Sequence, residues 1–469
     1  MAPTVAQRLD EAARSSPDKT VIAGPGGSLT WRQLDRRAGA VAAALVADGI
    51  RPGDRLAIAA TDLTDMAVGI LAGLKAGAAI APINPRLAEG EKQDILRVLR
   101  TARVLDALPA GEADFPAVTV EAETPAIILF TSGSTGAPKG VVLSQRAVAA
   151  GMALWTGPAL RIRPDDVAIA VLPLAHSYGL FGTLLAPLLV GATSVLVPRF
   201  TPEDVLGAIA TYRATIFSGV ATMFRRILDS GALAGADLSS LRFCTSGAAP
   251  CPWELAEDWR AATGVRIVRG YGMSELFRPI CYSPDDTMEI PEAIGRAPEG
   301  VRLRIVDEAG RTLEGDAVGE LLIRSATCMT EYIDRAEETR AVMADGWFRT
   351  GDLARVTPEG LVCIVGRKKE IILRGGYTIA AGEVEAALAA HPDVAEAAVI
   401  AVPHRELGEE VCAYVALRPG AAADREALVD FCRQRLAAYK YPRIVHFVAE
   451  LPKNRTGKID KTRLAGMVP

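Results

Sequence analysis

Residues 126–140 read AIILFTSGSTGAPKG and join a short apolar run to a dense cluster of hydrogen-bond donors. The apolar run at 126–130 predicts a buried strand, because it ends directly in a Gly/Ser/Thr segment. The glycines of that segment let backbone amides turn toward one anion, and its hydroxyl groups and Lys139 add donors and a positive charge. The spacing differs from the P-loop pattern GxxxxGK[ST], because Pro138 precedes the lysine and a glycine follows it. The segment therefore predicts a phosphate-binding turn after a strand.

On both sides of this turn, apolar runs alternate with helical patterns. Helices are expected for TVAQRLDEAARSS at 4–16 and TWRQLDRRAGAVAAALVADG at 30–49. Buried strands are expected for DRLAIAA at 54–60, AAIAPIN at 78–84, DVAIAVLPL at 166–174, SVLVP at 194–198, RATIFSGV at 213–220 and RFCTSGA at 242–248. Such runs separated by helices predict an α/β fold of mostly parallel sheets that are covered on both faces.

The pattern changes twice in the last third of the chain. Residues 295–365 hold short strands separated by Gly and Asp turns, which predicts a small antiparallel β subdomain. Beyond it, helices are expected at 382–394 and 425–439, with strands at 395–404 and 410–417. We therefore expect a large N-terminal domain, 1–366, and a small mobile α/β domain, 367–469.

Composition excludes several classes of protein. The chain has 469 residues, half of them hydrophobic, and 52 Lys+Arg against 56 Asp+Glu give a net charge of −4, which disfavours nucleic-acid binding. The seven cysteines are odd in number and form no CxxC pair, so buried thiols in a reducing cytosol are expected. The N-terminus resembles no secretory signal, and we expect a cytoplasmic protein.

One uncharged stretch is long enough to raise the question of a membrane span. Between Asp166 and Arg199 there is no Asp, Glu, Lys or Arg. Prolines, glycines and His176 interrupt this stretch, so we expect a buried strand, loop, helix and strand instead.

The segment TSGSTGAPKG resembles the phosphate loop of the adenylate-forming superfamily, which comprises acyl- and aryl-CoA synthetases, nonribosomal-peptide adenylation domains and beetle luciferases. Four further segments resemble this superfamily's motifs in the family's order, and the set reaches from Thr131 to Lys458. The chain is most similar to a free-standing bacterial acyl-CoA synthetase. This resemblance implies that the nucleotide phosphates bind at Thr131, Ser132, Gly133, Ser134, Thr135, Gly136 and Lys139.

The second segment is GYGMSE at 270–275. The resemblance implies that Tyr271 and Gly272 lie at the adenine, that Ser274 meets the α-phosphate and that Glu275 holds Mg²⁺ against the phosphates. Serine stands where the family more often has threonine, which keeps the hydroxyl group. One carboxylate together with substrate phosphate oxygens is a normal way to hold Mg²⁺.

The third and fourth segments are WFRTGD at 347–352 and GRKKE at 366–370, followed by LRGGY. The resemblance implies that Asp352 accepts hydrogen bonds from the ribose hydroxyls and that Arg367 reaches ribose or phosphate. It makes Lys369 the hinge residue. Gly375 and Gly376 are expected to line the tunnel for the thiol of CoA.

The fifth segment is LPKNRTGK at 451–458, whose last lysine the resemblance places between the acid and the α-phosphate. Lys458 is therefore the expected catalytic residue, because a positioned cation favours the charge that spreads over oxygens during attack on phosphorus. His176 in LPLAHSYGL is expected at the acyl pocket, with Gly247 and Ala248 in the pocket wall and the nucleotide site. This region lacks the Asp with which amino-acid-activating members hold the substrate ammonium.

The resemblance implies an ATP-dependent acid:CoA ligase that uses ATP, Mg²⁺ and CoA on an aliphatic or aryl monocarboxylic acid. It releases pyrophosphate on forming the acyl-adenylate, and AMP on forming the thioester. Arg226 or Arg278 could instead pair with a second carboxylate, since arginine recognises carboxylates through its planar fork. Three alternatives stay open: an acid:acyl-carrier-protein ligase, a luciferase-like oxygenase and a non-catalytic nucleotide-binding protein.

Overall fold

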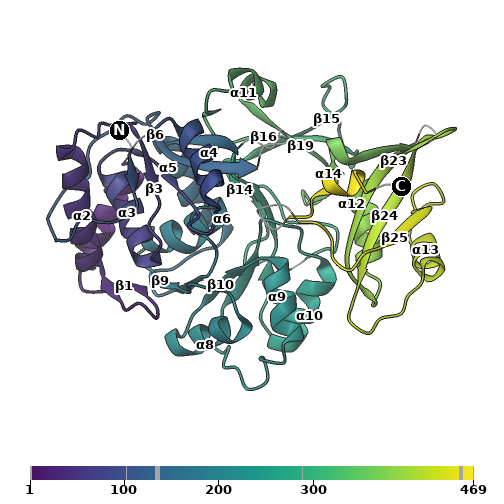
Figure 1. Cartoon of the computed structure of the whole chain (residues 1–469), viewed down its shortest axis with the longest axis horizontal. Coiled ribbons are helices and arrows are strands. Elements are labelled where there is room, and N and C mark those ends of the chain that lie inside the picture. The colour runs from purple at the N-terminus through teal and green to yellow at the C-terminus, as the bar shows by residue number, and fades with distance from the viewer. Residues whose placement is uncertain are drawn as a thin grey trace. The chain divides into compact units, whose positions relative to one another are not determined.

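The computed structural model describes residues 3–101, 103–132, 138–287, 289–374, 377–453 and 458–467. Contacts group the chain into two units, Met1–Arg302 with Arg324–Phe348 and Leu303–Ile323 with Arg349–Pro469 (Figure 1). The first unit contains two sheets rich in parallel strands, and the second contains most of the small β subdomain and the C-terminal α/β segment. The α/β fold class is confirmed. The domain boundary at 366 and 367 stays a prediction.

A seven-stranded sheet in the first unit has the order β12-β11-β10-β8-β9-β1-β2. Its strands are β1 (Thr20–Ala23), β2 (Leu29–Thr30), β8 (Val167–Ala170), β9 (Thr193–Leu196), β10 (Ile216–Gly219), β11 (Phe243–Ser246) and β12 (Ile267–Val268). All neighbours pair in parallel except β1 and β2. The helices α8 (Pro202–Tyr212), α9 (Ala221–Asp229) and α10 (Trp253–Thr263) share one core with this sheet (Figure 1). Its aromatic centre is Phe217, Phe224 and Trp259.

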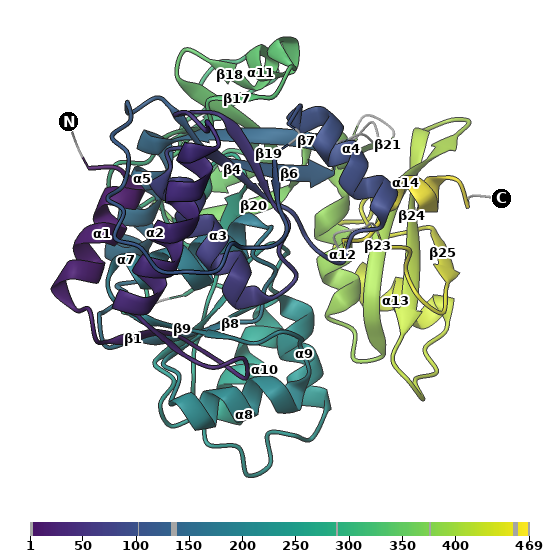
Figure 2. The ribbon, with the colours of Figure 1, turned by 60° about the vertical axis from the view of Figure 1, so that its left-hand side comes forward.

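The second sheet of this unit has the order β17-β7-β6-β4-β3-β5. Its strands are β3 (Arg55–Ile58), β4 (Ala79–Pro82), β5 (Val104–Leu105), β6 (Pro125–Ser132), β7 (Pro138–Ser144) and β17 (Glu331–Tyr332). The helix α4 (Glu89–Leu99) packs on one face of this sheet. The helices α1 (Val5–Ser15), α2 (Trp31–Ala47) and α3 (Leu63–Lys75) lie together, and α3 contacts β3 and β4 (Figure 2).

The uncharged stretch after Asp166 folds as predicted, into strand, loop, helix and strand. Between β8 and β9 lie α6 (Ser177–Gly179), a π-helical segment (Leu180–Leu185) and α7 (Ala186–Leu189). No helix in the described part of the chain combines the length and apolar character that a membrane crossing requires. The remaining elements of this unit are α5 (Gln145–Leu154), a π-helical turn (Trp155–Ala159), β13 (Gly270–Met273), β14 (Phe277–Cys281), α11 (Ala336–Val342) and β18 (Met343–Ala344).

The β subdomain is a five-stranded sheet, as the short strands predicted. Its order is β15-β16-β19-β18, with β20 also paired to β19. The strands not yet bounded are β15 (Arg302–Val306), β16 (Gly319–Arg324), β19 (Trp347–Val356) and β20 (Val362–Arg367). A 3₁₀ turn, Lys368–Glu370, follows β20.

The C-terminal segment forms a sheet of order β22-β21-β24-β23, with β25 beside β24. Its strands are β21 (Ile371–Arg374), β22 (Tyr377–Ala380), β23 (Val394–His404), β24 (Gly408–Leu417) and β25 (Ile444–Phe447). One face packs on α12 (Ala381–Ala389) and α13 (Arg425–Arg433), the other on α14 (Lys461–Ala465). The helix predicted at 425–439 ends early, because Leu436 and Tyr439 turn back onto the same core.

The cysteines are free, and six of the seven are buried. Cys251 alone is half-buried. The prediction of buried thiols is therefore confirmed for all positions but this one.

Candidate functional site

The predicted phosphate-binding turn lies between the antiparallel strands β6 and β7 in the sequence. The register pairs Thr131 with Lys139 and Ser132 with Pro138, so β7 runs antiparallel beside β6. Gly133, Ser134, Thr135 and Gly136 lie outside the described residues. The strand before the turn was predicted, whereas the return strand was not. The hairpin places Lys139 on a strand of the sheet.

Lys139 has two partners from the end of the first unit. Its ammonium lies 2.6 Å from Oε2 of Glu338 and 4.2 Å from the ring centroid of Tyr332. The hydroxyl of Tyr332 donates a hydrogen bond to Oε1 of Glu275, at 2.9 Å. The lysine of the predicted phosphate turn and the predicted Mg²⁺ carboxylate thus meet around one tyrosine.

The ionisation of these groups follows from their surroundings. Burial, then the charge of Glu275, raises the pKa of the Tyr332 hydroxyl far above neutral pH. Hydrogen bonds from Lys139 and then Arg335 hold the pKa of Glu338 below its ordinary value. At neutral pH the tyrosine is therefore a proton donor and Glu338 is an anion beside the lysine.

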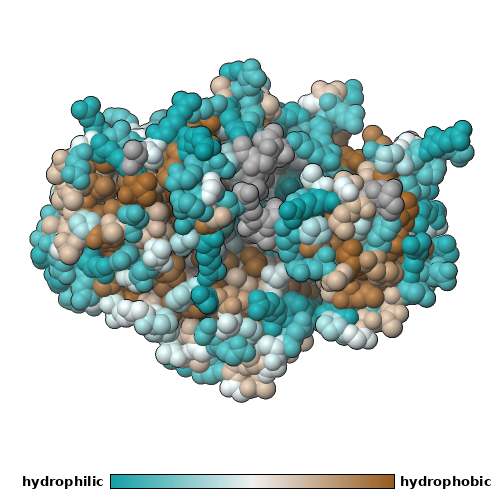
Figure 3. All heavy atoms as spheres, viewed as in Figure 1, coloured by the Kyte–Doolittle hydropathy of each residue, from teal (hydrophilic) through white to brown (hydrophobic). Residues whose placement is uncertain are grey.

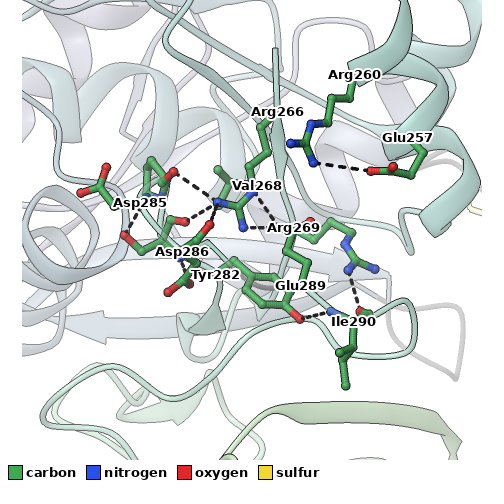
Figure 4. Close-up of polar contacts among 12 residues, drawn as sticks. Glu257, Arg260, Arg266, Val268, Arg269, Tyr282, Asp285, Asp286, Glu289 and Ile290 are labelled. Atoms are coloured by element: carbon green, nitrogen blue, oxygen red, sulfur yellow. Dashed lines mark hydrogen bonds and ion pairs between the residues drawn. The ribbon is translucent and has the colours of Figure 1, made fainter. Parts of the chain in front are cut away.

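Two arginines brace the segment that contains Tyr271 and Ser274. Arg269 donates to the carbonyl oxygens of Ile290 (2.9 Å) and Pro291 (2.8 Å). Arg266 donates to Glu289 and to the carbonyl oxygens of the loop 283–286 (Figure 4). These hydrogen bonds hold Arg269, which directly precedes the strand β13, in place.

Close packing holds the rest of this motif. A Cβ atom on Gly272 would lie 2.2 Å from the carbonyl oxygen of Phe277, so the hairpin of β13 and β14 accepts only glycine there. Tyr271, Ser274 and Glu275 are half-buried, and the amide of Met329 donates to the carbonyl oxygen of Glu275 at 2.8 Å. The segment is thus a strand and turn with its backbone fixed on two sides.

The predicted acyl-pocket residues lie near one another. His176 is half-buried and immediately precedes α6. Two residues later, the hydroxyl of Tyr178 lies 2.6 Å from Oγ1 of Thr245, and its ring adjoins Gly247. Ala248 follows with a left-handed backbone, φ 64°. The end of β11 therefore meets the segment that carries His176.

The two arginines that were considered as partners for a second carboxylate of the substrate lie in different surroundings. Arg278 is buried and donates to the carbonyl oxygens of Ser246 (3.3 Å) and Val268 (2.8 Å), so it holds strands together. Arg226 lines an open cavity of about 560 Å³ together with Arg86, Arg199, Phe200, Thr222 and Met223. Three guanidinium groups at one cavity favour an anionic ligand.

In the second unit, Asp352 and Arg367 are opposed on β19 and β20. The Nε atom of Arg367 lies 3.4 Å from Oδ1 of the buried Asp352, and the amide of Asp352 donates to Thr350. Lys369 and Lys458 are exposed. Gly375 and Gly376 lie outside the described residues. The structure thus brings the predicted ribose residue and its arginine together.

The donor set fits Mg²⁺ that is held mainly by a substrate. Among the described residues, no group of three or more His, Cys, Asp or Glu side chains has the geometry to hold a metal ion. Glu275 supplies one half-buried carboxylate, and Mg²⁺ in nucleotide sites is commonly bound by one or two carboxylates plus phosphate oxygens. A substrate with phosphates is then required to complete the site.

Sequence reasoning missed Tyr332 and Glu338. Tyr332 lies 57 positions from the carboxylate to which it donates, and β17 has only two residues. A strand of that length carries no periodic signal. Only the pairing of β17 with β7 brings these residues to Lys139.

Comparisons with known proteins identify the family and the fold of the chain. Residues 9–108 and 98–333 match the family described as AMP-binding enzyme. Residues 383–458 match the family described as AMP-binding enzyme C-terminal domain. The chain is 34% identical to a feruloyl-CoA synthase of Amycolatopsis sp, covering 96% of each, and 32% identical to the medium-chain fatty-acid–CoA ligase of Escherichia coli, covering 98% of this chain and 89% of that protein. ATP-bound MatB from Rhodopseudomonas palustris aligns with a TM-score of 0.92 at 30% identity over 98% of both chains.

Proposed function

Because the chain belongs to the AMP-binding enzyme family, among the acyl-CoA ligases of the adenylate-forming superfamily, we propose that it joins an aliphatic or aryl monocarboxylic acid to CoA. The observation that carries the proposal is the meeting of Lys139 and Glu275 around Tyr332. A cation and a carboxylate that contact one tyrosine, with the cation directly after a donor-rich segment in the sequence, suit a polyphosphate with its metal ion. The ATP-bound relative MatB supports ATP as that ligand.

The proposed reaction has two steps. The carboxylate of the acid attacks the α-phosphorus of ATP, and the bond to the leaving pyrophosphate breaks, which gives an acyl-adenylate. The thiol of CoA then attacks the acyl carbon, loses its proton and releases AMP. Lys458 stabilises the charge that develops on the phosphate oxygens in the first step. Mg²⁺ at Glu275 would neutralise phosphate charge when bound.

The ribose fits the second unit of the chain. Asp352 offers two carboxylate oxygens as acceptors for two hydroxyl groups, and the ion pair with Arg367 orients this carboxylate. The turn at Lys368–Glu370 follows the strand that carries Arg367. Lys369 in this turn is the proposed hinge, at which the small domain rotates between the two steps.

Exposed apolar side chains flank the predicted loop for the thiol. Leu373 and Tyr377 flank the predicted thiol loop and are 58% and 54% exposed. On the face shown in Figure 3, apolar residues also gather among hydrophilic ones on this unit. Exposed apolar groups beside a predicted CoA tunnel suit a surface that is covered when the thiol binds.

The acid is proposed to be neutral apart from its reacting carboxylate. The pocket segments at the ends of β10 and β11 contribute small residues, among them Ser218, Gly219 and Gly247, and the segment with His176 contains no Asp. A relative that is named for a medium-chain fatty acid and one named for ferulate support both acid classes.

A second candidate substrate is an acid with another anionic group. The cavity with Arg86, Arg199 and Arg226 favours it. The same three arginines also suit the phosphates of CoA. Arg226→Ala separates these ligands: a rise in KM for a dicarboxylic acid with unchanged KM for CoA supports the second carboxylate, and the reverse supports CoA.

Acid-dependent exchange of pyrophosphate into ATP tests the first step. A panel of aliphatic, aryl, dicarboxylic and amino acids is expected to give exchange with one of the first two classes. Competition between CoA and a phosphopantetheinyl carrier protein then identifies the thiol. Folded protein that binds ATP but exchanges with no acid would favour the non-catalytic alternative, and oxygen uptake with an aryl acid would reveal an oxygenase.

A further inference from the structure

Tyr332 touches both Lys139 and Glu275, the two groups assigned to the ATP phosphates and their metal ion. Its hydroxyl donates to Oε1 of Glu275, and its ring lies 4.2 Å from the ammonium of Lys139. We propose that Tyr332 is a positioning residue, which orients the Glu275 carboxylate for Mg²⁺ and keeps Lys139 apart from that metal ion. This inference rests on the proposed function, because it assumes that ATP is the ligand.

The sheet holds Tyr332 in place. Tyr332 pairs with Val141 in the antiparallel ladder of β17 and β7, two positions from Lys139. Its amide donates to Oγ1 of Thr339 at 3.0 Å, and the residue is 5% exposed. A buried aromatic side chain with a fixed backbone has few rotamers, so the position of its hydroxyl is set by the sheet.

The hydrogen bond has a directional consequence for Glu275. A carboxylate has two oxygens, and Tyr332 donates to Oε1. Oε2 then remains to face a cation, in an orientation that the tyrosine sets. Without the hydroxyl, the carboxylate would rotate and would have to be ordered again by each incoming metal ion.

The ring has a separate consequence for Lys139. The ammonium lies against the ring on one side and 2.6 Å from Oε2 of Glu338 on another. Glu338 is in turn held by Arg335, at 2.6 Å. When phosphates arrive, they replace Glu338 as the anionic partner of the lysine. The ring contact persists, because the ring attracts the ammonium without carrying a net charge that would repel the phosphates.

Two substitutions separate these roles. Tyr332→Phe removes the hydroxyl and keeps the ring, whereas Tyr332→Leu removes both. Isothermal titration of ATP into each protein, once with Mg²⁺ and once with EDTA, measures the gain in affinity that Mg²⁺ brings. In Tyr332→Phe we expect this gain to fall about tenfold, as for one lost hydrogen bond to a charged group, with unchanged affinity in EDTA. Tyr332→Leu should also bind ATP more weakly in EDTA.

Tyr282→Phe is the matched control. The hydroxyl of Tyr282 accepts from the amide of Ile290 at 3.2 Å, so this variant loses the hydroxyl of a buried tyrosine of the same unit that bonds the backbone (Figure 4). It should keep the full Mg²⁺ gain, and thermal unfolding confirms that each variant is folded. Pyrophosphate exchange should show a raised Mg²⁺ requirement with little change in kcat for Tyr332→Phe.

Two results would overturn the proposal: an unchanged Mg²⁺ gain in Tyr332→Phe, or an equal loss of affinity with and without Mg²⁺, which indicates a merely structural hydroxyl. Failure of the proposed function looks different. In that case the unsubstituted protein itself shows no binding of ATP under either condition, and both proposals are rejected together.

Discussion

Lys139 and Lys458, the two lysines assigned to the reaction, lie in contrasting surroundings. Lys139 stands on β7, its side chain is 19% exposed, and it contacts both Glu338 and Tyr332. Lys458 is exposed. Lys453, which lies earlier in the same motif, pairs with Glu396. The first lysine is therefore oriented by the protein before any ligand arrives.

The two lysines are expected to act at different stages of the reaction. Lys139 directly follows the predicted phosphate turn, and a group that binds the phosphates equally in the ground state and in the transition state lowers KM. Lys458 is assigned to the α-phosphate, where charge develops, and a contact that strengthens in the transition state raises kcat. Lys458 is then expected to affect the rate, and Lys139 the affinity.

Lys458→Ala should give the largest effect. We expect the rate of acid-dependent pyrophosphate exchange to fall by about 10²–10³, as for loss of one charge-stabilising donor. Thioester formation from supplied acyl-adenylate should change little. Both rates are measured on the same preparation.

Lys461→Ala is the control for this prediction, since Lys461 is a nearby lysine that pairs with Glu370 and Glu385. It should leave both half-reactions within a few-fold of the unsubstituted enzyme. Equal losses in the two half-reactions of Lys458→Ala would contradict the assignment of this lysine.

Asp352→Asn tests whether a buried and paired side chain of the second unit affects the affinity for ATP, as Lys139 is expected to do in the first unit. Asp352 belongs to the second unit but is buried and paired with Arg367, so it resembles Lys139. Loss of a charged acceptor of hydrogen bonds should raise KM for ATP by about tenfold to a hundredfold with a smaller change in kcat. Steady-state kinetics with varied ATP measure it.

A surface aspartate supplies the comparison for Asp352. Asp316 pairs with Arg355 in the same unit, and its side chain is 48% exposed. Asp316→Asn should leave KM for ATP unchanged. A drop in kcat at constant KM in Asp352→Asn would assign this carboxylate to the chemical step instead.

Local sequence was sufficient for the elements and for the order of motifs. The strands β6, β8, β10 and β11 and the helices α1, α2 and α12 follow from apolar runs and helical periodicity, which are properties of neighbouring residues. The family motifs also located Asp352 and Arg367, which the structure places opposite each other. These predictions needed no knowledge of distant contacts.

Contacts between distant segments were beyond this reasoning. Arg278 was considered as a partner for a second carboxylate of the substrate, but it donates to carbonyl oxygens of β11 and β12. No local sequence pattern predicts that these strands lie next to Arg278. Tyr332 and Glu338 reach Lys139 only because a two-residue strand joins the edge of a sheet. Sequence reasoning therefore missed the side chains that surround Lys139 and Glu275, while the roles of the motif residues stay predictions.

Gly272→Ala tests how firmly the first unit holds its motif. The added methyl group would lie 2.2 Å from a backbone oxygen, so β13 and β14 must separate, and we expect a loss of about 1–3 kcal/mol in the free energy of unfolding. Gly207→Ala in α8 meets open space and should gain up to about 1 kcal/mol. Urea unfolding of both variants checks this, and equal stabilities would contradict the close packing.

The smallest effect concerns the ion pair that keeps Lys139 in place. Hydrogen bonds from Lys139 and Arg335 hold the pKa of Glu338 below its ordinary value, so this group stabilises the folded protein above the pKa it has when unfolded. That stabilisation is lost as the pH falls through the lowered pKa. Because the Glu338 side chain is 43% exposed, screening limits the contribution to less than about 1 kcal/mol.

Glu338→Gln should therefore be slightly less stable at pH 7, and the free energies of unfolding of the two proteins should converge at acid pH in parallel urea titrations. A difference that stays constant down to pH 3 would mean that packing of the side chain, and not its charge, stabilises this corner of the sheet.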